Sequence, residues 1–195
     1  MNIAGVNRGY LKIEGAVSAF NFDFRDKTVL DIGSSTGGFT ELALKRGTKK
    51  VIAVEKGSHQ MKAPLRFDPR IELHEKTNIF DTTTKKSAKK VVVDFPDVIV
   101  ADVSFLSLTK ILKYAKLELA RSDTDFLVML KPQFEANSSQ LNRGIVKNEK
   151  TRREIIKNFE FWLKQNDFII IKKRDNDLAG RHGNIERFYW LKQAA

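Results

Sequence analysis

Apolar residues recur along the chain in two patterns, short β-branched runs and helical stripes. Helical spacing is clearest in an amphipathic segment over 8–20, where Ile13, Ala16, Val17 and Phe20 form one stripe. The same criteria predict further helices over 37–46, 59–66, 107–120 and 150–165. The short apolar runs predict strands over 28–32, 51–54, 71–73, 98–101, 125–130, 168–172 and 185–191.

Strands that alternate with helices indicate an α/β fold in which helices cover both faces of one sheet. Only the segment 173–184 joins the last two predicted strands, and it is too short for a crossover helix, so we expect these strands to be antiparallel. The 195 residues fit one domain, and no repeat or interdomain linker interrupts them. The expected fold is therefore a single Rossmann-like domain over 1–195 with a mostly parallel, seven-stranded sheet.

The charge balance adds information about partners. Lysine and arginine number 35 against 24 aspartates and glutamates, which gives a net charge of +11. This excess favours a polyanionic partner, although a basic protein without such a partner could have the same composition. Basic clusters lie at 85–90, 143–153 and 172–174. On the basic surface we expect phosphate contacts from Lys85, Lys86, Arg143, Lys147, Arg152 and Arg153.

Several classes of protein are disfavoured by the residue inventory. The chain has no cysteine, which excludes a disulfide framework and a thiolate metal site. His59, His74 and His182 lack the spacing of metal ligands, so we expect no metal. No apolar run approaches the about 18 residues of a membrane-spanning helix, and the first ten residues do not read as a signal peptide. We therefore expect a cytoplasmic protein.

The strongest local signal is a glycine-rich turn between a strand and a helix, VLDIGSSTGGFTELAL at 29–44. It is not a dinucleotide fingerprint, because Ser35 stands where that motif needs glycine, and it lacks the ending of a P-loop. Its D-x-G-x-x-x-G spacing resembles motif I of S-adenosylmethionine (SAM) methyltransferases. The amides at the start of the following helix could bind the carboxylate of such a cofactor.

An acidic residue follows this turn at a suitable distance. Glu55 ends the next predicted strand, 22 residues beyond Gly33, where folds of this kind place the carboxylate that binds ribose hydroxyls. The alternative is a strand-end glutamate without a ligand. Asn78, just past the third strand, is a weaker candidate for contacts near an adenine. The expected cofactor-binding residues are Asp31, Gly33, Ser34, Ser35, Thr36, Gly37, Gly38, Phe39, Glu55, Asn78 and Asp102.

An ordered series of segments resembles the TlyA/FtsJ-like ribose 2′-O-methyltransferases, of which some members carry the older name hemolysin. The matching segments are NRGYLKIEGAV (7–17), VLDIGSSTGGFT (29–40), VIVADVSFLSL (98–108), LVMLKPQFEA (127–136), RGIV (143–146) and GNIERFYWL (183–191). The resemblance implies SAM as cofactor, RNA as substrate with ribosomal RNA expected, and a catalytic Lys-Asp-Lys-Glu tetrad. By motif matching the tetrad falls on Lys12, Asp102, Lys131 and Glu186, with the segment 1–24 contributing to the active site.

Some alternatives stay open at this stage. TlyA-type proteins usually carry a small RNA-binding domain before the methyltransferase, and little precedes Lys12 here, so we expect weak RNA affinity from this chain alone. The protein could instead be a catalytically silent, ribosome-associated RNA-binding module, a small-molecule methyltransferase or a membrane-active hemolysin. Lys131 could remove the proton of the acceptor hydroxyl, or it could orient that hydroxyl as a charged donor.

Overall fold

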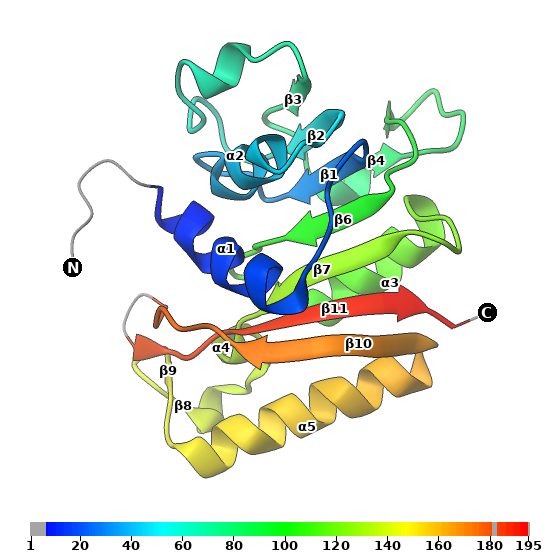
Figure 1. Cartoon of the computed structure of the whole chain (residues 1–195). Coiled ribbons are helices and arrows are strands. Elements are labelled where there is room, and N and C mark those ends of the chain that lie inside the picture. Colours follow the sequence, from blue (N-terminus) through cyan, green and yellow to red (C-terminus); the bar gives the residue numbers. More distant parts are fainter. Residues whose placement is uncertain (1–6, 181–182, 195) are drawn as a thin grey trace.

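A computed structural model describes residues 7–180 and 183–194, and Figure 1 shows the arrangement of their elements. One seven-stranded sheet has the order β10-β11-β7-β6-β1-β2-β3. Its strands are β1 (Thr28–Ile32), β2 (Lys50–Val54), β3 (Ile71–His74), β6 (Val98–Ala101), β7 (Asp125–Leu130), β10 (Phe168–Asp175) and β11 (Arg187–Gln193). The neighbours from β3 to β7 pair in parallel, whereas β11 is antiparallel to both β7 and β10. The predicted sheet and its antiparallel last pair are confirmed.

Helices cover both faces of this sheet, as expected. They are α1 (Arg8–Phe20), α2 (Gly38–Lys45), α3 (Leu108–Glu118), α4 (Pro132–Glu135) and α5 (Glu149–Gln165). Successive strand residues point to opposite faces. In β1, Val29 belongs to the apolar cluster that includes α1 and α2, and Leu30 to the cluster that includes α3 and α5. Burial on both faces explains why the strands are nearly continuous apolar runs.

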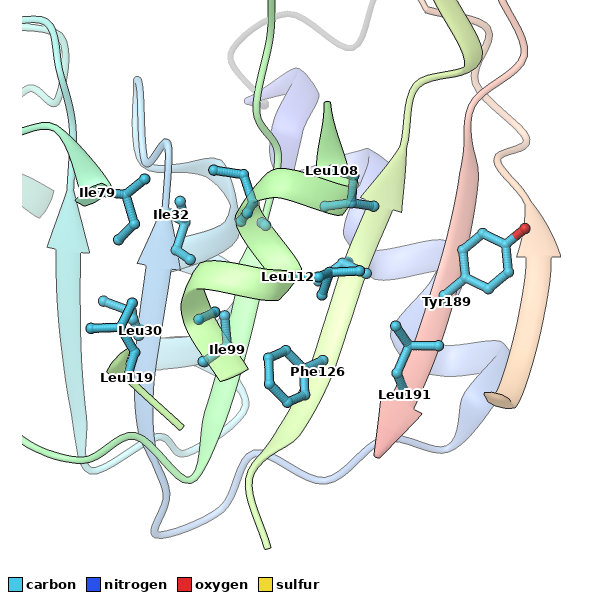
Figure 2. Packing of buried hydrophobic residues seen from close by; sticks show 14 of the residues in the cluster. Leu30, Ile32, Ile79, Ile99, Leu108, Leu112, Leu119, Phe126, Tyr189 and Leu191 are labelled. Carbon is cyan, nitrogen blue, oxygen red and sulfur yellow. The ribbon is translucent and has the colours of Figure 1, made fainter. Parts of the chain in front are cut away.

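The cluster under α3 illustrates what holds the layers together. Figure 2 shows Leu108 and Leu112 of α3 facing the strands that carry Ile99 and Phe126. All four side chains are at most 1% exposed. Each such burial contributes about 1.5–3 kcal/mol relative to an exposed side chain, so α3 is fixed firmly on the sheet. The start of α3 is thereby a rigid support for the loop that precedes it.

The crossing of α1 and α2 on the other face is unusually close. A Cβ atom at Gly38 would lie 2.6 Å from the backbone nitrogen of Tyr10. Asn7 caps α1, since its side chain accepts a hydrogen bond from Gly9 N, and the same side chain donates to Thr36 Oγ1 at 2.9 Å. The first helix is therefore tied directly to the glycine-rich turn.

The structure corrects the predicted helix over 59–66. This segment contains only the 3-10 turn η1 (Leu65–Phe67). His59 has a φ of +56°, and Pro64 has no N–H to donate, so neither suits a helix interior. The predicted strand over 185–191 begins instead at Arg187, which leaves Glu186 in the preceding loop.

Several short elements were not predicted. Besides α4 they are η2 (Ile79–Asp81), η3 (Ser138–Gln140), the pair β4 (Thr82–Thr83) and β5 (Val91–Val92), and the hairpin β8 (Leu141–Asn142) and β9 (Ile145–Val146). Elements of two to four residues have no apolar period from which they could be recognised. Among the described residues, no helix combines the length and the apolar character needed to span a membrane.

Candidate active site

A cleft of about 1770 Å³ opens where β1, β6 and β7 end. The carboxyl ends of parallel strands are the usual ligand sites of such sheets. The glycine-rich turn follows β1 and contributes Gly33 to the wall. All four side chains of the expected tetrad line the same cleft, although they come from four separate segments: Lys12, Asp102, Lys131 and Glu186.

Lys131 and Asp102 form the first of two ion pairs in this cleft. Asp102 directly follows β6 and Lys131 directly follows β7, and these strands are parallel neighbours. Lys131 Nζ lies 2.5 Å from Asp102 Oδ1 and donates a hydrogen bond to Ser104 Oγ at 2.9 Å. An ammonium group has three N–H donors. The hydrogen bond to Ser104 engages one of them, whereas Asp102 Oδ1 is paired with the ammonium by charge and has no hydrogen-bond partner among the described residues, so N–H donors remain for a ligand.

Lys12 and Glu186 form the second ion pair. Their Nζ and Oε2 atoms are 2.6 Å apart, and their side chains are only 10% and 3% exposed. Lys12 comes from the middle of α1, and Glu186 from the residue before β11. A Cβ at Gly180 would lie 2.8 Å from Glu186 Oε1, so a larger residue there would require this carboxylate to shift. The two pairs together place two positive and two negative groups in one cleft.

The glycine-rich turn is folded back against β2. The amides of Gly33 and Ser34 both donate to the carbonyl of Val54, and Gly33 has a φ of +78°. A Cβ at Gly33 would lie 3.2 Å from the carbonyl oxygen of Asp102, so this glycine permits a close approach of two strand ends. The predicted cofactor residues that line the cleft are Asp31, Gly33, Ser34, Ser35, Thr36, Gly38, Phe39 and Asp102.

Two glycines of the motif have a packing role that the sequence did not predict. Gly37 has a φ of +86°, and a Cβ there would collide with the Leu65 side chain. Gly37 is outside the cleft lining. Gly38 lines the cleft, but it also lets the backbone of α1 approach α2. The pair of glycines thus shapes the walls around the cleft as well as its surface.

Asp31 is the most perturbed acid in the cleft. Its Oδ2 accepts a hydrogen bond from Thr40 Oγ1 at 2.6 Å, while Oδ1 is buried without a hydrogen-bond partner in the described part of the chain. Burial, and then the carboxylate of Asp102, raises the pKa of Asp31 to about 7. Ser34 Oγ is likewise buried without a partner. These two groups and the free amides of the α2 N-terminus fit a ligand that carries both an ammonium and a carboxylate, as the methionine part of SAM does.

Glu55 and Asn78 do not line the cleft. Glu55 Oε2 accepts from Ser35 N at 2.9 Å, and its Oε1 accepts from Gly57 N at 2.6 Å and from Gln60 Nε2 at 3.3 Å. Asn78 caps η2 through a hydrogen bond from Phe80 N. Glu55 is therefore next to the glycine-rich turn, as expected, but its oxygens already have protein partners.

Ser104 and Glu135 belong to the site's surroundings and were not predicted. Ser104 lines the cleft and accepts from Lys131. Glu135 Oε1 accepts from Leu108 N, and its Oε2 accepts from Ser107 Oγ, both at 2.6 Å. Glu135 thereby caps α3 from the end of α4, which directly follows Lys131. Motif matching at KPQFE predicts a role for the lysine, but nothing in this segment indicates that its glutamate caps α3.

The structure contradicts the prediction that Arg152 is on a phosphate-binding surface. Its side chain is 9% exposed, and its guanidinium donates to Asp175 Oδ1 at 2.7 Å and to the carbonyl of Ile185 at 3.2 Å. It also lies 3.3 Å from Glu149. A guanidinium with these partners is a structural link between α5 and β10. Its neighbour Arg153 is exposed.

The basic clusters do not form one surface. Lys85 Nζ donates to the carbonyl of Leu117 and lies 3.2 Å from Glu118, at the C-terminal end of α3. The cleft is at the other end of this 11-residue helix, about 16 Å away along its axis. The exposed Lys86 shares this remote position, and Lys172, Lys173 and Arg174 all bond within the protein. Arg143 alone of the six predicted contacts lines the cleft.

No group of three or more His, Asp or Glu side chains that could hold a metal ion occurs in the described ranges.

Comparison with known proteins shows the family of the chain. The family model for the FtsJ-like methyltransferases matches residues 5–193. The 16S/23S rRNA (cytidine-2′-O)-methyltransferase TlyA of Mycobacterium tuberculosis is 35% identical over 190 residues, which are 97% of this chain and 69% of that protein. Hemolysin A of Brachyspira hyodysenteriae is 37% identical over 188 residues, 95% of this chain and 75% of that protein.

A solved structure is also closely similar. "Putative hemolysin from Streptococcus thermophilus" superposes with a TM-score of 0.89 at 31% identity, covering 100% of this chain and 69% of that one. The family match extends over nearly all of the chain, and these two relatives exceed 30% identity over more than two thirds of their own lengths. This chain therefore belongs to the FtsJ-like methyltransferase family.

Proposed function

We propose that this protein is a SAM-dependent methyltransferase that methylates a ribose 2′-hydroxyl of ribosomal RNA in the cytoplasm. The observation that carries the proposal is the meeting of Lys12, Asp102, Lys131 and Glu186 in one cleft beside the glycine-rich turn. The name of the Mycobacterium tuberculosis relative supports the ribose 2′-oxygen as acceptor. Residues 1–195 act as one methyltransferase domain, to which the segment 1–24 contributes Lys12.

In this proposal the turn over 31–39 holds the cofactor. SAM supplies an activated methyl group on a sulfonium centre. Asp31 offers its unpartnered carboxylate oxygen to the ammonium of the cofactor, and the amides at the start of α2 receive the carboxylate. Glu55 takes the ribose hydroxyls by exchanging its contact with Gln60, which is at the edge of the cleft. Asn78 is assigned to the adenine end.

The tetrad aligns the acceptor hydroxyl. Lys131, held by its ion pair with Asp102 and its hydrogen bond to Ser104, is assigned to donate an N–H to the ribose 2′-oxygen. Lys131 is assigned to orient this oxygen, and the two carboxylates of the tetrad, Asp102 and Glu186, are assigned to accept the hydroxyl proton. The new bond joins the 2′-oxygen to the methyl carbon as the carbon–sulfur bond breaks. Positioning of the two reactants supplies much of the rate.

Methyl transfer from labelled SAM to isolated ribosomal subunits tests the proposal. We expect label on a ribose 2′-oxygen, mapped by resistance of one internucleotide bond to alkaline cleavage. Lys131→Ala should lower the rate at least 100-fold and leave SAM affinity within threefold, because Lys131 is assigned to the acceptor. Lys113→Ala, an equal change on the exposed side of α3, is the control.

Other outcomes would select the alternatives. RNA binding without any methyl transfer would indicate a catalytically silent module, and transfer to a base would refute the assigned acceptor. Transfer to small molecules that RNA does not inhibit would indicate a small-molecule enzyme. A Lys131→Ala variant with near-normal turnover would remove this residue from the chemistry.

A further inference from the structure

The hairpin β8–β9 has an unexpected residue at its tip. Asn142 pairs with Ile145, so Arg143 and Gly144 form a two-residue turn, and their φ angles are +47° and +80°. Turns with two such angles favour asparagine and glycine, whereas a long side chain is unfavourable in the left-handed region. An arginine in this unfavourable backbone conformation indicates that its side chain has a functional role.

The tip of this hairpin is at the cleft, and the guanidinium of Arg143 is available there. Arg143 and Gly144 both line the cleft together with the tetrad, and Arg143 is exposed. Three lysines line the cleft: Lys12 and Lys131 are neutralised by carboxylates, and Lys62 is exposed. Arg143 has no ion-pair or hydrogen-bond partner among residues 7–180 and 183–194. An unpaired guanidinium beside an acceptor pocket suits a phosphate, which it binds through paired N–H donors.

A buried asparagine fixes the hairpin in place. Asn184 is 5% exposed, and its side chain makes two hydrogen bonds to the hairpin backbone. Its Nδ2 donates to the carbonyl of Gly144 at 3.1 Å, and its Oδ1 accepts from Val146 N at 3.0 Å. Asn184 is also two residues before Glu186 of the tetrad. One side chain thus joins the loop that carries a tetrad carboxylate to the turn that carries Arg143.

We propose that Arg143 binds a phosphodiester that flanks the acceptor ribose, and that Asn184 is the positioning residue that holds Arg143 at the cleft. This inference rests on the proposed function and adds to it a residue for the RNA backbone. The proposal explains why an arginine is present at a strained turn position, because Asn184 holds the hairpin where the Arg143 side chain reaches the substrate.

One substitution of Arg143 is expected to weaken RNA binding without lowering the stability of the protein. Arg143→Asn suits the turn better, so the midpoint of urea unfolding should stay the same or rise. Affinity for labelled 16S and 23S rRNA transcripts should fall about fivefold to eightfold at 0.1 M salt. The slope of log affinity against log salt should become shallower by about 0.7–0.9, the value for one phosphate contact. Lys113→Gln, on the exposed side of α3, is the control and should leave the slope unchanged.

The positioning role of Asn184 is tested by combining its substitution with that of Arg143. Asn184→Ala should make the salt slope shallower in the same direction, and the double variant should bind no more weakly than Arg143→Asn alone, because both changes remove one interaction. Asn184→Asp keeps the acceptor for Val146 N but loses the donor to Gly144, so its affinity should fall between those of wild type and Asn184→Ala. SAM affinity should be unchanged in all three variants.

Two results would overturn the inference while the proposed function stands. The first is a wild-type protein that methylates ribose and an Arg143→Asn variant that keeps both affinity and slope. The second is an Asn184→Ala effect that adds fully to that of Arg143→Asn, or that lowers turnover at an unchanged salt slope, since either would indicate that Asn184 acts through Glu186. A wild-type protein without RNA methylation would instead refute the proposed function.

Discussion

Asp31→Asn is expected to remove a large part of the pH dependence of the protein's stability and to weaken its affinity for SAM. Asp31 is 1% exposed and accepts a hydrogen bond from Thr40 Oγ1, and an asparagine can keep both the shape and this hydrogen bond. Burial is the main cause that raises the pKa of Asp31 to about 7, and the charge of Asp102 adds to it. The substitution removes the titrating group without opening a cavity.

The magnitude follows from linkage between protonation and folding. The pKa of Asp31 is about 7 in the folded protein and 3.8 ordinarily, so the folded state binds more protons between these two values. The free energy of unfolding therefore falls as the pH rises from about 4 to about 7. At 1.36 kcal/mol for each pH unit, the whole loss is about 4 kcal/mol, of which about 2 kcal/mol falls between pH 5 and pH 7 and about 3 kcal/mol between pH 5 and pH 8.

Urea unfolding of the ligand-free wild type and of Asp31→Asn at pH 5, 6, 7 and 8 measures this loss. Subtracting the free energies of unfolding of the two proteins cancels the contributions of the other titrating groups. This difference should change by about 3 kcal/mol from pH 5 to pH 8, in favour of the variant at high pH. Calorimetry at pH 8 should give a SAM affinity about tenfold lower for the variant, as expected for one lost charge-assisted hydrogen bond. Parallel pH profiles for the two proteins would refute the reasoning.

Three further predictions concern the residues that hold the site together. Arg152→Gln should lower the free energy of unfolding by about 2–3 kcal/mol in urea, and Arg153→Gln by less than about 0.5 kcal/mol. The reason is that, of the two, only Arg152 is buried with partners. Equal effects would favour the interpretation that Arg152 is on a phosphate-binding surface. Gly38→Ala should lower the melting temperature by roughly 5–10 °C, because its Cβ would lie 2.6 Å from a backbone nitrogen of α1, and an unchanged melting curve would contradict that crossing. Glu135→Ala should lower the free energy of unfolding by about 1–2 kcal/mol in urea, because α3 loses its cap. The same variant should transfer methyl groups from labelled SAM about tenfold more slowly at constant SAM affinity. Normal turnover would exclude a positioning role.

Much of the fold could be predicted because its strands are buried on both faces. The run at Val98–Ala101 is fully buried, and such runs stand out in a sequence without any knowledge of their partners. The segment 59–66 misled the prediction for a related reason. Met61 is buried and Leu65 is partly buried against the same cluster, at helical spacing, but they reach it from a loop that His59 and Pro64 prevent from becoming a helix.

The site could be predicted only in part, because charge along a sequence does not reveal which charges are paired. Arg152 and Arg153 are adjacent and chemically identical, and only the distant Asp175 decides that the first is buried. Lys12 entered the prediction through a family resemblance, since nothing in its surroundings indicates a contact with Glu186, 174 positions later. Local pattern and motif spacing located the cleft, and long-range pairing determined which residues are in it.

The close crossing of α1 and α2 has a kinetic consequence. Because the backbones touch at Gly38, the helix that carries Lys12 and the helix that begins at the cofactor turn move as one body. If the proposed function holds, we expect the lysine assigned to the acceptor and the turn assigned to the cofactor to stay together while the products leave. We expect release to involve parts of the rim that are not built on these helices, such as the loop around Leu65 and the hairpin tip at Gly144. The turnover rate of this protein should accordingly respond to the stiffness of those two loops more than to changes in the helices themselves.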